Sequence, residues 1–166
     1  LLLLLLSKVD AVLPELQQRF KNKVQKEEAV IYRGIEGVKN YLNDILEVNE
    51  TFYSWGAKGF WRDERLKYFL PKFDRQRLKQ GIHFRHIFDW EVKQFASEIL
   101  KLRMNEYKFL PPQYSSLMSI DIFGDHVVTF TSVDVGNFGD DGMIFVMVNE
   151  KLAESYKTWF RFMWDH

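Results

Sequence analysis

Two histidines and an aspartate lie close together along the chain, in a pattern that could bind a metal ion. His83, His86 and Asp89 are spaced three residues apart, and the first two fall in an apolar run over 82–88 that is typical of a strand. Residues three apart on a strand point to opposite faces, so they cannot share one ion without a bulge. The other interpretation is a strand with two polar side chains. We favour it and expect no metal site.

Other segments lack the residues that common catalytic and binding motifs require. The Gly- and Asp-rich loop 134–142 has no glutamate at the twelfth position of a calcium loop. The run 34–37 lacks the third glycine and the lysine of a phosphate-binding loop. Ser115 and Ser116 lie outside any GxSxG turn, and the chain has no cysteine. We therefore expect no cofactor.

Composition favours one folded domain. The chain has 166 residues, of which 46% are hydrophobic and 28% charged, with 23 basic against 23 acidic groups. This balance excludes a disordered chain and a uniformly basic nucleic-acid coat. The six leucines at 1–6 are too few to span a membrane and follow no basic start, so we expect no membrane partner and a cytoplasmic location.

Charge is uneven along the chain. Residues 57–108 carry 13 basic and 7 acidic groups, whereas residues 109–166 carry 3 and 8. These segments could attract each other within the fold or across a dimer, or they could be ordinary solvated faces.

Strand-like and helix-like patterns alternate through the first two-thirds of the chain. Strands are predicted at 29–33, 51–55, 82–88, 107–110, 117–123, 126–131 and 143–148, and helices from residue 34 and at 62–79, 91–102 and 150–164. Gly124 and Asp125 form a tight-turn pair between two of these strands. The pattern predicts an α/β fold with a mixed, largely parallel sheet flanked by helices.

An apolar seam with steps of four and three residues runs through the N-terminal segment. It could be a coiled-coil dimer seam, or it could pack onto the domain. Pro14 interrupts it. We expect residues 1–27 to form a linker or dimerisation helix and residues 28–166 a separate domain. The seam consists of Leu2, Leu6, Val9, Leu13, Leu16 and Phe20.

The last third of the chain carries three consecutive motifs in a recognisable order. They are the run 117–132, the strand-like 143–149, and a helix whose end reads Phe160-Arg-Phe-Met-Trp164; upstream segments 31–38 and 79–85 fit the same pattern. In this order the chain resembles the TrmB-like transcriptional regulators common in archaea. The resemblance implies a phospholipase-D-like effector domain. It also implies a preceding winged helix–turn–helix, which the start without methionine fits.

The resemblance also implies where catalytic residues would lie. The parent enzymes use a histidine followed two residues later by a lysine. Here the histidine position is Leu117 or Met118 and the lysine position is Ser119 or Ile120, so we expect a domain that is not an enzyme. The polar pair 131–132 replaces the enzymes' Gly-Ser. The sugar-sensing members continue with a β-rich subdomain after the last helix, whereas this sequence stops at His166.

Together these observations predict an effector-sensing, homodimeric regulatory domain. DNA would be bound only through the preceding domain, and the effector would be a sugar or another polar metabolite. Stacking aromatics, an arginine that would contact an anionic or hydroxylated ligand, and hydrogen-bonding serines would line the cleft: Trp55, Arg85, Tyr114, Ser116 and Ser132. The alternatives are a stand-alone ligand-binding or structural dimerisation module, a divergent phosphodiesterase or nuclease, and a nucleic-acid binder that uses the basic middle.

Overall fold

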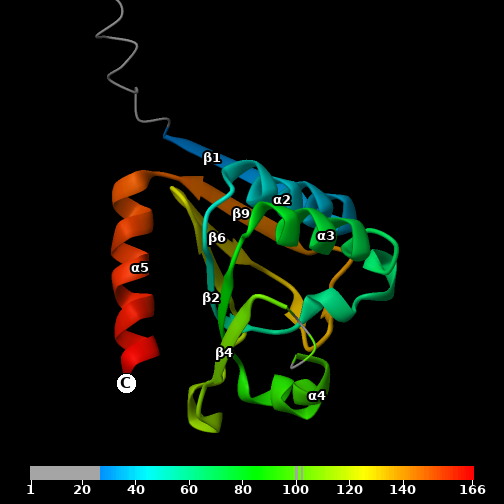
Figure 1. Cartoon of the computed structure of the whole chain (residues 1–166), viewed down its shortest axis with the longest axis vertical. Helices are drawn as coiled ribbons and strands as arrows, with labels where there is room; N and C mark the ends of the chain where they lie inside the picture. The colour runs from blue at the N-terminus through cyan, green and yellow to red at the C-terminus, as the bar shows by residue number, and fades with distance from the viewer. Residues whose placement is uncertain (1–26, 100, 102) are drawn as a thin grey trace, which may run out of the picture.

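The domain consists of three layers. The computed structural model describes residues 27–99, 101 and 103–166. A seven-stranded sheet forms the middle layer, with helices α2 (Gly34–Val48) and α3 (Leu70–Gln80) on one face and α5 (Glu150–Asp165) on the other (Figure 1). The predicted seam of Leu2, Leu6, Val9, Leu13, Leu16 and Phe20 lies outside the described residues, so its role in dimerisation stays a prediction.

The sheet is mixed, and most of its pairings are antiparallel. Its strands lie in the order β1-β9-β6-β5-β2-β3-β4. Only β2 pairs with β3 and β3 with β4 in parallel; the other four pairings are antiparallel. The bounds are β1 Glu28–Arg33, β2 Phe52–Ala57, β3 Phe84–Phe88, β4 Asn105–Phe109, β5 Ile120–Phe123, β6 His126–Phe130 and β9 Met143–Val148.

The predicted α/β class with flanking helices is confirmed, but the expectation of a largely parallel sheet is wrong. Helical connections lead from β1 to β2, from β2 to β3 and from β3 to β4, and these four strands run in the same direction. Because β9, β6 and β5 lie between β1 and β2, only the pairings of β2 with β3 and of β3 with β4 are parallel. The turn at Gly124, with φ 53°, reverses the chain between β5 and β6 and makes that pair antiparallel. The first strand, β1, lies at the sheet edge against the last, β9, also antiparallel.

The expected helix over 62–79 is replaced by short turns followed by α3. Two 3-10 turns, η1 (Phe60–Arg62) and η2 (Glu64–Leu66), precede it, and Pro71 lies in its first turn. A proline fits there because the first helical N–H groups have no partner within the helix. The remaining short elements are η3 Trp90–Phe95, α4 Ala96–Ile99, η4 Pro112–Tyr114, β7 Val133–Asp134 and β8 Asn137–Phe138.

Local sequence explains where α2 and α5 begin and end. Gly34 opens α2 with φ 58° and donates its N–H to the carbonyl of Gly142 at 2.9 Å. Asn49 closes α2 in the left-handed conformation. At the start of α5, the Asn149 side chain accepts a hydrogen bond from the N–H of Leu152 at 3.0 Å.

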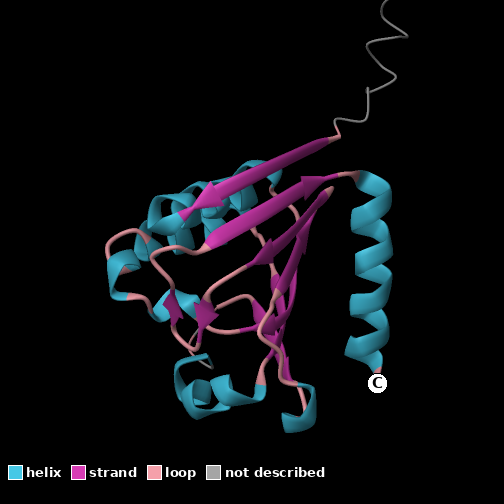
Figure 2. Ribbon diagram, turned by 180° about the vertical axis from the view of Figure 1, so that it is seen from behind, coloured by secondary structure: helices cyan, strands magenta, loops and turns pink. Residues whose placement is uncertain are grey.

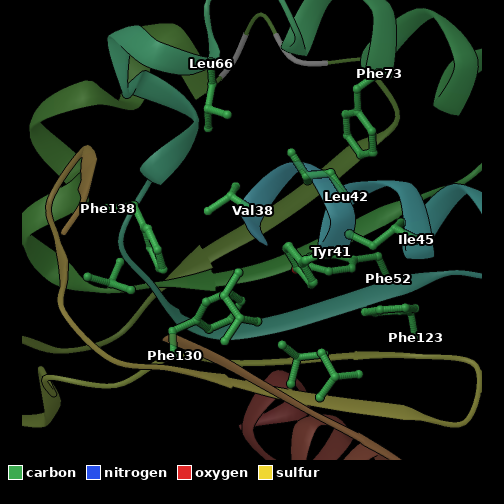
Figure 3. Close-up of a cluster of buried hydrophobic side chains, with 14 of the residues drawn as sticks. Val38, Tyr41, Leu42, Ile45, Phe52, Leu66, Phe73, Phe123, Phe130 and Phe138 are labelled. Carbon is green, nitrogen blue, oxygen red and sulfur yellow. The ribbon is translucent and has the colours of Figure 1, made fainter. Parts of the chain in front are cut away.

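The two faces of the sheet bury different side chains. The face under α2 and α3, which we call the α2/α3 face, carries an aromatic cluster in which Tyr41 meets Phe130 and Phe123 edge-on at 5.3 and 6.0 Å (Figure 3). The opposite face of the sheet, which we call the α5 face, is covered by α5 (Figure 2). On this face Ile122 and Val127 belong to one buried cluster with Phe160 of α5. None of the helices in the described part of the chain is long and apolar enough to cross a membrane.

Candidate functional site

A cavity of about 120 Å³ lies between the sheet and the two helices α2 and α3. Most of its wall is apolar and aromatic, with Leu42, Ile45, Phe52, Phe60, Trp61, Leu70, Phe73 and Phe84. Polar groups also reach it from four neighbouring strands and both helices. Binding sites for small molecules combine a largely apolar wall with a few placed polar groups, and this cavity has that character.

Three polar residues form a row across the α2/α3 face of the sheet. Ser54 of β2 lies directly opposite Asp121 of β5 on one side and His86 of β3 on the other. All three side chains are buried and line the cavity. Polar residues in the middle of a buried sheet destabilise a fold unless they are paired, so the partners of each group matter.

The carboxyl group of Asp121 has two hydrogen-bond partners. The hydroxyl of Tyr41, on α2, donates to it, and Ser54 is its second partner. Burial raises the pKa of Asp121 to about 7, although both hydrogen bonds act in the opposite direction. The carboxyl group can therefore exchange a proton near neutral pH.

His86 is neutral and incompletely paired. Its ring stacks on Phe88 with centroids 4.7 Å apart and lies 5.6 Å from both Phe52 and Phe84. Burial, and then the positive charge of Arg77, lower the pKa of His86 to about 3. Its Nδ1 has no hydrogen-bond partner although the residue is only 8% exposed.

Asn105 adds a second incompletely paired group. It begins β4 opposite Phe84, one step diagonally from His86. Both the oxygen and the nitrogen of its carboxamide are buried without a partner. Among the described side chains that line the cavity, only His86 and Asn105 leave buried polar atoms without a partner. An unpaired buried polar group costs about 1 to 3 kcal/mol, so a ligand that pairs with it would relieve that cost.

The two cations at the cavity wall are already paired. Arg77 donates to the Asp74 carboxylate at 3.1 Å and to the carbonyls of Ile82 and Arg103 at 3.2 and 3.0 Å. Lys58 forms a buried ion pair with Asp89. The cavity therefore presents no uncommitted positive charge among the described groups.

The five residues predicted to bind a ligand do not line this cavity. Trp55 lies on the α5 face, stacked on Tyr156 at 5.9 Å. Arg85 lies on the same face, pairs with Glu106 at 3.1 Å and sits over the Trp164 ring. The structure brings these two to one face of the sheet, and their role in binding a ligand stays a prediction.

The other three predicted residues lie in loops. Tyr114 is exposed in η4, and Ser116 donates to the carbonyl of Met118 at 2.7 Å. This loop passes close to Gly56 at the end of β2, where a Cβ would lie 2.6 Å from the Met118 carbonyl oxygen. Ser132 is exposed in a turn after β6, with φ 55°.

The residues considered for a metal site are separated by the fold. His83 is exposed and precedes β3, His86 faces the cavity, and Asp89 is paired with Lys58. In residues 27–99, 101 and 103–166, no three histidine or acidic side chains are grouped so that they could hold a metal ion.

Of the four positions that the resemblance assigns to catalysis, only Ser119 lines the cavity. Leu117 and Met118 are 89% and 52% exposed, whereas Ser119 is buried in the cavity wall. Ile120 packs on the α5 face. None of these four side chains is the histidine or the lysine that the resemblance implies for the parent enzymes.

Sequence reasoning missed Ser54, Asn105 and Asp121 as candidate site residues, and considered His86 only for a metal site or for a rearranged phosphodiesterase site. A signal was available, because Asp121 and Ser54 interrupt the apolar strands Ile120–Phe123 and Phe52–Ala57 at positions of the same pleat. Recognising that they meet required knowing that β5 pairs with β2, which no local pattern indicates.

Comparison with known proteins supports the fold. No known family matches the chain, and no curated protein sequence does. Among solved structures, the archaeal chromatin protein TrmBL2, whose structure is described as showing a novel mode of DNA binding, superposes with a TM-score of 0.59 at 14% identity. That match covers 96% of this chain and 58% of TrmBL2, so the chain spans a little over half of that protein.

NucT from Helicobacter pylori also superposes with a TM-score of 0.59, at 10% identity. The match covers 84% of this chain and 97% of NucT. At these identities the likeness concerns the fold alone. It shows that this chain shares its mixed α/β fold with these two proteins.

Proposed function

We propose that this chain is the effector-binding domain of a TrmB-like transcriptional regulator and does not hydrolyse phosphodiesters. The observation that carries the proposal is the cavity under α2 and α3, where His86 and Asn105 hold polar atoms that are buried and unpaired. A fold retains such groups at a cost in stability, which a bound ligand would offset.

Two further observations support this reading. The fold is shared with TrmBL2, a DNA-binding chromatin protein, over nearly the whole of this chain. The position that the resemblance assigns to the catalytic histidine holds Leu117 or Met118, whose side chains cannot attack a phosphate. The position assigned to the lysine holds Ser119 or Ile120, which carry no positive charge to hold the phosphate.

Ligand binding is tested by equilibrating the purified protein with a cell metabolite extract and identifying retained small molecules by mass spectrometry. We expect at least one molecule to be retained by the wild type and lost in Asn105→Leu, which keeps the side-chain size but removes both polar atoms. Glu106→Gln, on the exposed side of the same strand, is the matched control. Retention of nothing, or equal retention by Asn105→Leu, would contradict the proposal.

Regulation requires that the ligand changes DNA binding. We expect the native polypeptide to shift a DNA duplex in a salt-dependent manner, and the retained molecule to change its affinity for DNA. An unchanged affinity would leave a ligand-binding domain without the proposed regulatory role.

Homodimerisation belongs to the same proposal and rests on the apolar seam of the N-terminal segment. Light scattering should give a dimer mass for the wild type and a monomer mass for the double variant Leu6→Glu/Leu13→Glu. An unchanged dimer mass would exclude the seam as the interface.

A divergent nuclease is the second candidate, because the match to NucT covers 97% of that chain and a histidine lines the cavity. Metal-independent hydrolysis of bis(p-nitrophenyl) phosphate, lost in His86→Ala or His83→Ala, would favour this candidate over the first. We expect no hydrolysis above the buffer rate.

A further inference from the structure

The chemistry of the cavity wall limits which ligand it can hold. This argument rests on the proposed function, that the cavity binds a small molecule, and concerns the class of that molecule. Three properties matter: the charges at the wall, the number of unpaired polar atoms, and the size and shape of the space.

An anionic ligand lacks a counter-ion in this cavity. Both cations of the wall are committed, Arg77 to Asp74 and two carbonyls and Lys58 to Asp89. The Asp121 carboxyl lies on the same wall and would repel a second anion whenever it is ionised. A buried charge without a partner is strongly unfavourable, so phosphates and carboxylates fit this wall poorly.

A cationic ligand fits no better. It would enter a wall that already holds Arg77 and Lys58, and the Asp121 carboxyl that could face it is already occupied by Tyr41 and Ser54. The electrostatics therefore favour a neutral molecule.

A sugar has too many hydroxyl groups for the polar atoms that are free. Among the described groups of the wall, Nδ1 of His86 and the two carboxamide atoms of Asn105 are the buried polar atoms without a partner. Phe52, Phe73 and Phe84 face the rest of the space. Each hydroxyl turned toward these rings would lose its hydrogen bonds to water without replacement.

The unpaired carboxamide of Asn105 favours a ligand with a particular arrangement of hydrogen-bond donor and acceptor. It offers one donor and one acceptor side by side, whichever way the amide is turned. A lactam edge, with an N–H next to a C=O, complements this pair in either orientation. The volume of about 120 Å³ is somewhat smaller than that of apolar cavities, about 150 Å³, that admit benzene, so one small ring is the largest ligand that this space can enclose.

We propose that the cavity binds a neutral, planar, single-ring molecule through a lactam edge, which pairs with the Asn105 carboxamide while the ring packs among Phe52, Phe73 and Phe84. His86 Nδ1 lies one diagonal step away on the neighbouring strand and serves a second polar atom of such a ring. Pyrimidine bases and pyridones belong to this class.

Matched probes test the proposal by isothermal titration calorimetry. We expect 2-pyridone to bind, and N-methyl-2-pyridone, which has lost the donor, to bind at least about tenfold more weakly, because it leaves a buried polar group unpaired. Inorganic phosphate and glucose, the probes for an anion and a sugar, should show no binding that depends on the cavity. Equal binding of the two pyridones would overturn the lactam assignment.

Two variants of β4 test whether 2-pyridone binds in the cavity, and their stability to urea gives a second measurement besides affinity. Asn105→Leu should lose 2-pyridone binding at least about tenfold, yet its midpoint of urea unfolding should rise, because an unpaired buried carboxamide has been removed. The control Glu106→Gln should leave the affinity unchanged. If Asn105→Leu binds 2-pyridone as well as the wild type does, the assignment is wrong.

The outcomes separate this inference from the proposed function. Glucose or phosphate binding that Asn105→Leu abolishes would overturn the ligand class and leave an effector-binding cavity in place. If none of the four probes binds and the metabolite extract yields nothing, the ligand class and the proposed function both fail.

Discussion

The two faces of the sheet are built on different principles. On the α5 face, Tyr53 and Trp55 pack on Phe160 at 5.1 and 6.4 Å, and the buried residues of that cluster are all apolar. On the α2/α3 face, Asp121, Ser54 and His86 interrupt the apolar cluster and border a cavity. Tight apolar packing contributes stability, whereas buried polar atoms beside a cavity reduce it. The α5 face is therefore packed without buried polar groups, whereas the α2/α3 face combines the larger apolar cluster with a polar row beside the cavity where we propose that a ligand binds.

The largest expected effect lies on the α5 face. Phe160→Ala removes a ring that is 1% exposed and contacts Tyr53, Trp55 and Trp164. We expect a loss of about 3 to 5 kcal/mol in the free energy of unfolding, measured with urea. Affinity for a cavity ligand should stay unchanged where the variant is folded. A weaker affinity with little loss of stability would reverse the roles of the two faces.

The free energy of unfolding should depend on pH through Asp121 and His86, the two titratable groups of the polar row on the α2/α3 face. The folded pKa of Asp121 is raised to about 7, so its contribution favours the folded state at low pH and is lost as pH rises from about 4 to 7. The folded pKa of His86 is lowered to about 3, so its contribution is lost as pH falls below about 6.5. The two slopes oppose each other in the wild type.

Single variants should reveal each slope separately. Relative to the wild type, Asp121→Asn should lose stability on acidification below pH 6.5, because the His86 slope is no longer opposed. His86→Gln should become more stable relative to the wild type as the pH is lowered from 7 to 4, because only the Asp121 slope remains. Over this pH range the change in the free energy of unfolding of each variant relative to the wild type should be on the order of 4 kcal/mol, measured by urea unfolding at a series of pH values. Parallel pH curves for all three proteins would show that neither group is buried as described.

Tyr41→Phe should have a smaller effect on the same face. It removes the hydroxyl that donates to the Asp121 carboxyl, and the loss should cost about 1 to 3 kcal/mol of stability. Because that hydrogen bond lowers the pKa of Asp121, the pKa should rise further in the variant, as followed by an NMR titration of the carboxyl carbon. An unchanged pKa would mean that the two groups are not bonded in solution.

Arg85→Ala should have the smallest effect and distinguishes the two faces as binding sites. Arg85 forms an exposed pair with Glu106, and such pairs contribute about 0 to 1 kcal/mol. Binding of a cavity ligand should not change. A clear loss of affinity for the ligand would show that the binding site lies on the α5 face, where the sequence predicts that Trp55 and Arg85 bind a ligand.

Sequence reasoning predicted elements better than their partners. The strands at Ala29–Arg33 and Met143–Val148 and the helices beginning at Gly34 and Glu150 are confirmed, because each has a clear apolar period and a capping or turn residue. Which strands pair is a non-local property. The antiparallel contact of β1 with β9 joins residues more than a hundred positions apart, and no local pattern encodes it.

The candidate site depends on the same non-local information. Asp121, Ser54 and His86 come from three strands that are neighbours only because β5 inserts beside β2. Aromatic residues such as Trp55 were favoured for a ligand on the basis of residue type. In the structure the Trp55 ring packs against α5. A single sequence does not distinguish an aromatic ring that packs in the core from one that stacks on a ligand.

The central claim is that a ligand binds on the α2/α3 face. NMR spectra of the isotope-labelled protein, recorded while 2-pyridone, phenol and glucose are added in turn, test it most directly. We predict that at least one compound shifts the signals of Ser54, His86 and Asn105 and leaves the Trp55 indole unchanged. Shifts confined to Trp55 and Arg85, or no shift with any compound, would contradict the account.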